Sequence, residues 1–307
     1  MRPGGWSGAV LDRVAGVAAL GAMLTALSEM AFYPVALDEG LAVMVLAYGL
    51  LGWLAVGALA VARRDDRAAW WIAGGLVGFL AEGVVVGQLY AEWPLSIVWT
   101  PLAWHAAVSV MVGIVAVRAA LDRSAAATLA TTAALGVGLG LWGAWMWRVG
   151  ADEASFAQVP VADYAVQAAL AWALWALGHA LWAWRGHRLA RATGRGELAA
   201  LAVLAALVWA PWAVGAFPVS LTLPAVVAAS IWGLRRRGAP SLAEAPPAAP
   251  RTGPLWATAA LPVAAVGTFA AAQAAGLSWP VNLAVLLGCG LPAAWAWGRA
   301  VLGRPAI

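Results

Sequence analysis

Long apolar runs separated by short polar stretches repeat along the whole chain. Most runs hold about 20 residues, the length that an α-helix needs to cross a hydrocarbon core about 30 Å thick. Transmembrane strands would alternate apolar and polar residues, and open sheets leave backbone donors unsatisfied in lipid. The pattern therefore predicts an all-α, polytopic transmembrane helix bundle of about ten spans. The predicted spans are 14–33, 41–62, 69–90, 97–118, 125–147, 163–184, 197–214, 217–234, 255–275 and 280–300.

Two of these assignments have alternatives. The first run follows a basic start, as a cleaved signal peptide would, but it is longer than a usual signal core and we interpret it as a retained span. Gly215, Phe217 and Pro218 make only a short break in 197–234, so this stretch holds either one span or two. If 197–234 holds two spans, the basic cluster that follows it lies on the same side of the membrane as the other basic clusters.

Positive charge is distributed very unevenly between the two sides of this pattern. The chain has 18 basic residues, all of them arginine. With the N-terminus in the cytoplasm, every arginine except Arg148 falls in a cytoplasmic segment. The charged residues of the outer segments are mainly acidic. Because arginine and lysine accumulate on the cytoplasmic side of membrane proteins, the pattern predicts that both termini are cytoplasmic. The outer acidic residues are Asp38, Glu39, Glu92, Asp152, Glu153 and Asp163.

Composition narrows the class further. Hydrophobic residues make up 64% of the chain, and the mean hydropathy is +0.83. The basic residues lie in short clusters between apolar runs, which favours membrane topology over nucleic-acid binding. We expect an integral protein of a bacterial or archaeal cell membrane. Its expected partners are membrane lipids and a small solute or lipid substrate, and no nucleic acid; its oligomeric state is left open.

Several kinds of chemistry are absent from the sequence. The lack of lysine excludes a lysine Schiff base and the lysine-bearing phosphate loop of an ATP-driven pump acting alone. Cys289 is the only cysteine, so no intrachain disulfide forms. His105 and His179 fall at different predicted depths, which disfavours a shared metal ion or a bis-histidine haem. We expect no metal and no cofactor.

The Pro/Ala-rich stretch 238–254 divides the chain. It is polar enough to remain solvated, and we expect a flexible cytoplasmic linker. It separates a main transmembrane bundle, residues 1–237, from a C-terminal transmembrane helix pair, residues 255–307. Most of the buried polarity lies in the first six spans, where we place the candidate site.

Glu29, Glu82, His105 and His179 lie within predicted spans. An ionisable group in a membrane costs several kcal/mol unless it is paired or hydrated, so each is a functional candidate. Glu82 and His105 each lie eight residues from the outer end of their spans, which places both about 12 Å below the outer boundary. Their two spans form a hairpin with a short loop. We therefore expect Glu82 and His105 to meet and to act as a proton-transfer pair.

The surrounding sequence predicts an outward-opening polar pocket. Gly75 and Gly78 share a helix face with Glu82, and small residues at four-residue spacing, in the pairs Gly74/Gly78 and Gly83/Gly87, allow close helix approach. The alternative is a structural hydrogen bond that locks the hairpin. The expected substrate-binding residues are Glu29, Tyr90, Thr100, Trp104 and Ser109.

Three functions fit these features. The first is a proton-coupled secondary transporter of a small solute, which the span count and the intramembrane acid favour. The second is a membrane-embedded enzyme that uses Glu82 and His105 as acid and base on a lipid or isoprenoid; HExxH and GxSxG motifs are absent. The third is a non-catalytic scaffold subunit. The sequence alone leaves open whether the chain is an enzyme.

Overall fold

The computed structural model describes residues 5–146, 148–149, 157–236, 253–277 and 286–303. Helices make up nearly all of it, with one antiparallel pair of two-residue strands, β1 (Arg148–Val149) and β2 (Ala157–Gln158), between α5 and α6. The expected linker, 238–254, lies outside the described residues except for its last two positions. The long helical elements are α1 (Gly5–Thr25) with η1 (Ala26–Met30), α2 (Glu39–Ala62), α3 (Arg67–Leu80) with η2 (Ala81–Val86), η5 (Trp99–Ala116) with α4 (Val117–Arg123), α5 (Ala125–Met146), α6 (Val161–Trp184), α8 (Arg195–Gly215), α9 (Thr222–Arg236) and α10 (Ala260–Ala274).

Shorter elements connect these helices. They are η3 (Gln88–Tyr90), η4 (Leu95–Ile97), η7 (Gly186–Arg188), α7 (Leu189–Ala192), η8 (Val219–Leu221), η9 (Leu255–Ala259), η10 (Leu286–Gly290) and α12 (Leu291–Val301). Asp38 and Asp66 cap the N-termini of α2 and α3 through side-chain bonds to backbone N–H groups. Gly87, with φ of 80°, ends η2 in a left-handed conformation, which side chains disfavour.

Within the described residues, eight helices are long and apolar enough to cross a membrane. They correspond to eight of the ten predicted spans, so the all-helical prediction is confirmed and the eight apolar helices are compatible with a multi-pass membrane protein. The predicted span 217–234 corresponds to η8 with α9, and the described part of 280–300 corresponds to η10 and most of α12. The eight helices cover 8–30, 39–62, 67–86, 95–123, 125–145, 161–184, 195–215 and 255–274.

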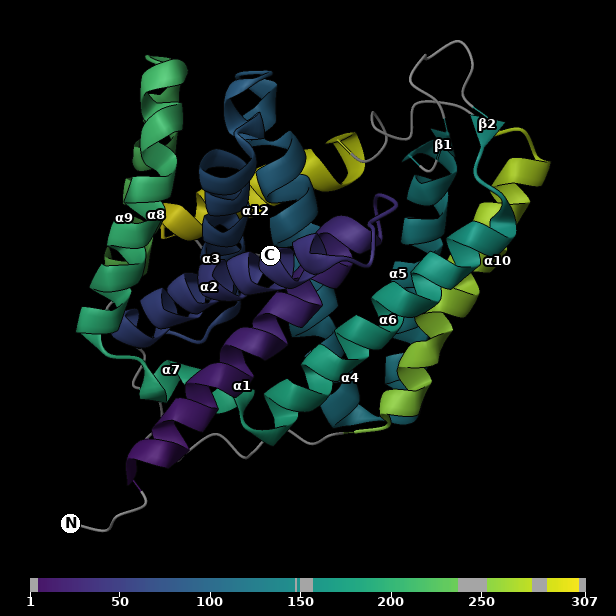
Figure 1. The fold of residues 1–307 in the computed structure, drawn as a ribbon, viewed down its shortest axis with the longest axis horizontal. Helices are drawn as coiled ribbons and strands as arrows, with labels where there is room; N and C mark the ends of the chain where they lie inside the picture. The colour runs from purple at the N-terminus through teal and green to yellow at the C-terminus, as the bar shows by residue number, and fades with distance from the viewer. Residues whose placement is uncertain (1–4, 147, 150–156, 237–252, 278–285, 304–307) are drawn as a thin grey trace.

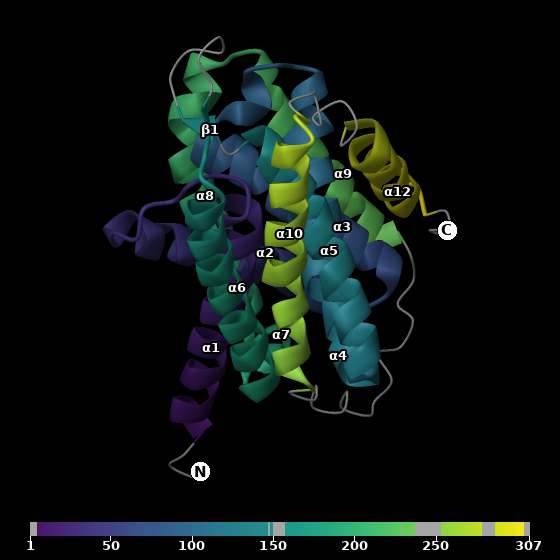
Figure 2. The same cartoon turned by 90° about the vertical axis from the view of Figure 1, so that its right-hand side faces the viewer.

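The helices gather in two groups around α1, α2 and α3 (Figure 1). On one side α10 packs against α5 and α6; on the other, α9 and α12 pack against α3. Short α12 lies across the bundle instead of along it (Figures 1 and 2). Among the described C-terminal elements, α10 and α12 therefore rest mainly on different parts of the bundle.

Close helix contacts depend on glycine. A Cβ atom at Gly78 would lie 2.2 Å from the Pro101 carbonyl oxygen, and one at Gly74 would lie 3.0 Å from the Cα of Ala106. The predicted close approach of another backbone at this glycine pair is thus confirmed. The second predicted pair behaves differently, because Gly83 and Gly87 face side chains, including the Trp212 ring.

Ion pairs tie the arginine-rich segments together at one end of the bundle. Arg185, after α6, lies 2.7 Å from Asp12 of α1, and Arg13 of α1 lies 2.7 Å from Glu197 of α8. Arg64, whose side chain is fully buried, pairs with Asp66 and donates to the carbonyl of residue 233 in α9. The segments after the second and sixth predicted spans and the end of α9 therefore lie on one face, together with the start of α1.

Candidate functional site

Three π-helical segments carry the ionisable and hydroxyl side chains that meet at the candidate site. Ser28 and Glu29 lie on η1, Glu82 lies on η2, and His105 and Ser109 lie on η5. Such turns are rare in proteins and are frequent at functional sites. They widen the helix by one residue per turn, which changes the direction in which the following side chains point.

Proline explains how one of these segments begins. Pro101 has no backbone N–H, so it cannot make the α-helical bond to the carbonyl of Ile97. Near this proline the N–H of Ala103 donates to the carbonyl of Val98, five residues back, at 3.0 Å. The wider register then continues through His105 to Ala116.

Glu82 and His105 meet at the centre of the site. The Nε2 atom of His105 lies 2.9 Å from Oε1 of Glu82, and the two residues are only 2% and 7% exposed, respectively. The Nδ1 atom of His105 lies 3.0 Å from the Ser28 hydroxyl oxygen, which lies 2.9 Å from that of Ser109. The Ser109 hydroxyl donates to the carbonyl of Trp104 at 3.3 Å.

The hydrogen bonds from His105 to the Trp104 carbonyl all run in one donor-to-acceptor direction. A carbonyl oxygen only accepts, so the Ser109 hydroxyl donates to it and accepts from Ser28. Ser28 then accepts from His105, so Nδ1 of His105 carries a proton. One further proton is needed between Nε2 and Glu82, since two unprotonated atoms would repel at 2.9 Å. That proton lies on the imidazole or on the carboxyl group, and the same heavy-atom positions suit both forms.

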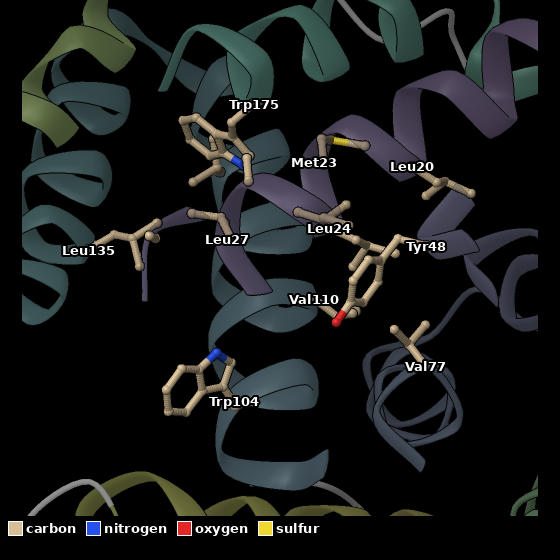
Figure 3. Close-up of a cluster of buried hydrophobic side chains, with 14 of the residues drawn as sticks. Leu20, Met23, Leu24, Leu27, Tyr48, Val77, Trp104, Val110, Leu135 and Trp175 are labelled. Atoms are coloured by element: carbon tan, nitrogen blue, oxygen red, sulfur yellow. The ribbon is translucent and has the colours of Figure 1, made fainter. Parts of the chain in front are cut away.

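A second carboxyl group lies beside this chain. The Tyr48 hydroxyl of α2 donates to Glu29, and the Tyr48 ring lies 5.9 Å from the imidazole of His105. Glu29 is close enough to interact electrostatically with Glu82 and His105. Figure 3 shows Tyr48 among apolar residues that include Leu24, Val77 and Val110. We call Ser28, Glu29, Tyr48, Glu82, His105 and Ser109 the polar cluster.

Aromatic side chains lie next to the polar cluster. The Trp104 ring contacts Phe32 at 3.5 Å and Trp142 at 4.2 Å between centroids, and it lies nearly parallel to Tyr33 at 6.3 Å. Tyr33 is 42% exposed. We call Phe32, Tyr33, Trp99, Trp104, Trp142 and Trp145 the aromatic cluster.

The structure brings together most of the predicted site residues. Glu29, Glu82, His105 and Ser109 are in the polar cluster, and Trp104 borders it. The Glu82–His105 pair is buried, and two crevices, one beside η1 and one beside α2, have no residue of the polar cluster in their linings. The expected outward-opening pocket stays a prediction. The predicted roles of Glu82 and His105 in proton transfer, and of the other residues in substrate binding, stay predictions.

Two predicted substrate-binding residues, Tyr90 and Thr100, make no hydrogen bond to the polar cluster. The Tyr90 hydroxyl donates to the carbonyl of Gly83 and accepts from Trp209 of α8, both at 2.8 Å, so its hydrogen bonds go to η2 and α8 and not to the Glu82 or His105 side chain. The Thr100 hydroxyl oxygen is buried and has no hydrogen-bond partner among the described residues. Its place one turn before Trp104 puts it beside the aromatic cluster.

Ser28, Tyr48 and Trp142 were not predicted as site residues. Ser28 immediately precedes Glu29 in a predicted span, and Tyr48 is a polar side chain near the middle of another. Both signals were available, but neither shows which way the side chain points. Trp142 gives no signal of its own among 21 tryptophans.

His179 is separate from the polar cluster. It is fully buried, and its Nε2 atom lies 3.0 Å from the carbonyl of Gly113, which also accepts from the Trp175 indole. Within the described parts of the chain, no three histidine, cysteine, aspartate or glutamate residues are placed to hold a metal ion. Glu82 and His105 alone would supply two ligands.

An apolar crevice opens between η1, α5, α6 and α10. Leu27, Leu139, Tyr164, Trp172 and Trp175 are among the residues that line it. Neither Glu82 nor His105 belongs to this lining. A lipid chain held in the crevice would therefore not contact the acid–imidazole pair.

The fold and the site define a helical, multi-pass membrane protein with an acid–imidazole pair buried between two of its membrane helices. Comparisons with protein-family models, with curated proteins and with solved structures found no match for this chain. Its function is therefore inferred from the site.

Proposed function

We propose that this protein is a proton-coupled secondary transporter of a small solute, and that Glu82 and His105 hold the coupling proton. The observation that supports this most strongly is the directed hydrogen-bond chain from Glu82 to the carbonyl of Trp104, which requires one proton between carboxyl and imidazole. Intramembrane ionisable pairs of this kind are typical of proton relays in transporters.

The burial of the Glu82–His105 pair fits an occluded state in such a cycle. A carrier exposes its site to each side in turn, and between these states the site is shut off from both. The π-helical turns of η1, η2 and η5 allow small shifts of register that would open or close the site. The enzyme alternative has less support, because the apolar crevice does not reach Glu82 or His105.

The transporter is proposed to lie in a bacterial or archaeal cell membrane with ten crossings and both termini in the cytoplasm. The ion pairs that gather arginine-rich segments on one face support this orientation. Val301, at the end of α12, packs against Gly233 of α9, two residues before Arg235. The last described helix thus ends toward the arginine-bearing face.

Cysteine labelling tests the orientation. In a Cys289→Ser background, Asp38→Cys lies on the proposed outer face and Gly196→Cys, in an open position at the start of α8, lies on the inner face. A membrane-impermeant maleimide is expected to label Asp38→Cys on intact cells, and Gly196→Cys only after permeabilisation. The reverse labelling pattern would contradict the proposed orientation.

Proton movement tests the transporter proposal. Proteoliposomes that contain a pH-sensitive dye are exposed to gradients of amines, carboxylates and neutral solutes. The wild-type protein is expected to change the internal pH with at least one solute class. Glu82→Gln should reduce that change to the level of empty vesicles, because an amide keeps a hydrogen bond to His105 but cannot take up the proton.

Glu92→Gln is the matched control, since Glu92 lies in the exposed outer loop between η3 and η4. It should move protons as the wild type does. The proposal fails if Glu82→Gln transports as well as the wild type. It also fails if the wild-type protein moves no protons with any solute class.

A further inference from the structure

We infer that the transported solute is a monovalent organic cation, an amine or quaternary ammonium ion on an apolar body, which Glu29 and the aromatic cluster bind. This inference depends on the proposed function and identifies the substrate class of the same site. It rests on the charge of the polar cluster and on the aromatic residues that follow Glu29 and pack on Trp104.

The polar cluster has one negative charge more than it can neutralise. With the shared proton, Glu82 and His105 together carry no net charge in either form. Glu29 has only the Tyr48 hydroxyl as a polar side-chain partner, and no described arginine pairs with Glu29 or Glu82. A largely buried carboxylate with so little compensation is costly. Glu29 therefore holds a proton or faces a cation.

Aromatic residues follow Glu29 by one turn. The backbone N–H groups of Phe32 and Tyr33 both donate to the backbone carbonyl of Glu29, at 2.8 and 2.9 Å. The planes of Tyr33 and Trp104 differ by only 14°. A cation within about 6 Å of such ring faces is attracted by their quadrupoles, most strongly where water is excluded.

The approach from outside also favours positive charge. Tyr33 is partly exposed, and the segment that follows it carries the exposed acids Asp38 and Glu39. Acidic groups at the mouth of a site raise the local concentration of cations and speed their association. A cation would thus pass Asp38 and Glu39, then Tyr33, before it reaches Glu29.

The exchange balances in charge and in protons. When the cation enters, the Glu29 carboxyl group loses one proton, and the resulting carboxylate neutralises the cation. The neighbouring Glu82–His105 pair passes this proton on, which is the coupling step of the proposed function. When the cation leaves, Glu29 takes up one proton again through the same pair, so one proton moves for each cation and the net charge of the site stays constant.

Binding of hydrophobic ions to the purified full-length protein tests this inference. Tetraphenylphosphonium and tetraphenylborate have nearly the same shape and opposite charge. Tetraphenylphosphonium is expected to bind and to release about one proton in weakly buffered solution. Glu29→Gln should weaken its binding about tenfold or more, because a charge-assisted contact is lost. Tetraphenylborate should not show binding that depends on Glu29.

Two variants separate a binding effect from misfolding. Glu29→Asp keeps the ionisable group and should still release a proton when the cation binds, although with lower affinity. Glu92→Gln should bind the cation with wild-type affinity. Equal elution volumes in size-exclusion chromatography show that the variants are folded alike.

The inference is overturned if tetraphenylborate binds as tightly as tetraphenylphosphonium, if neither ion binds, or if Glu29→Gln binds the cation as the wild type does. Its failure differs from failure of the transporter proposal. If an anion or a neutral solute drives proton movement that needs Glu82, the protein is a proton-coupled transporter and the cation assignment is wrong. If Glu29-dependent cation binding is present but Glu82→Gln moves protons normally, the assignment of the coupling proton is wrong.

Discussion

Replacing Gly78 by alanine is expected to destabilise the protein by about 2–3 kcal/mol and to reduce transport activity, because the added methyl group meets a rigid backbone. The new Cβ atom would lie 2.2, 2.6 and 2.7 Å from the carbonyl oxygen, Cα and carbonyl carbon of Pro101. None of these atoms belongs to a flexible side chain. The helices α3 and η5 must therefore separate, and this separation lengthens the contact between Glu82 and His105.

Gly138→Ala provides a matched control in helix α5. A Cβ atom at Gly138 would have no heavy atom within 4 Å outside its own helix, so alanine fits without movement. Because alanine is a better helix former by about 1 kcal/mol, this variant should be as stable as the wild type or slightly more stable. Denaturant titration in mixed micelles compares the two variants. Equal stabilities would show that close contact at Gly78 is not required.

Helix positions could be predicted from the sequence because they depend on a strong local signal. Apolar runs of membrane-spanning length give the eight candidate helices, most to within a few residues at each end. The third predicted span extends to Tyr90, whereas η2 ends at Val86, because Gly87 adopts a left-handed conformation that hydropathy does not reveal. α12 is only 11 residues long and lies across α3, an arrangement set by packing.

The central pair could be predicted because depth and adjacency follow from counting residues. Glu82 and His105 lie equally far from a short loop, so an antiparallel hairpin places them at one height. Ser28 and Tyr48 belong to helices whose rotation about their axes the sequence does not give. The π-helical turns of η1, η2 and η5 add to this difficulty, since each shifts the phase of the side chains that follow.

Tyr90 is a residue that the sequence placed in the site and that makes its hydrogen bonds elsewhere. Its position near the outer end of the third span suggested a substrate contact. In the structure its hydroxyl donates to the Gly83 carbonyl, within a π-helical segment, and accepts from the Trp209 indole. The relevant neighbour, α8, lies more than 100 residues later in the chain, and no local pattern predicts this contact.

A second large effect is expected when only one residue of the Glu82–His105 pair is replaced. His105→Leu leaves Glu82 buried without its partner, and an uncompensated buried charge typically costs about 3–5 kcal/mol. Part of this cost is avoided if Glu82 binds a proton, so we expect a loss of about 3 kcal/mol in the free energy of unfolding. His187→Leu, at a partly exposed histidine outside the membrane helices, should cost less than about 1 kcal/mol.

Removing both partners should restore the fold but not the function. In Glu82→Met/His105→Leu two apolar side chains of similar size replace the pair, and such replacements are often neutral or stabilising. We therefore expect a free energy of unfolding within about 1 kcal/mol of the wild type, and a coupling between the two positions of about 2 kcal/mol. In proteoliposomes the double variant should move no protons with any solute.

The combination separates a structural role from a functional one. If the pair only locked the hairpin formed by α3 and η5, a stable double variant would transport as the wild type does. If His105→Leu alone were as stable as the wild type, Glu82 would not depend on the imidazole, and the shared proton would lose its structural basis. Stability regained together with proton movement lost is the result that assigns the coupling proton to Glu82 and His105.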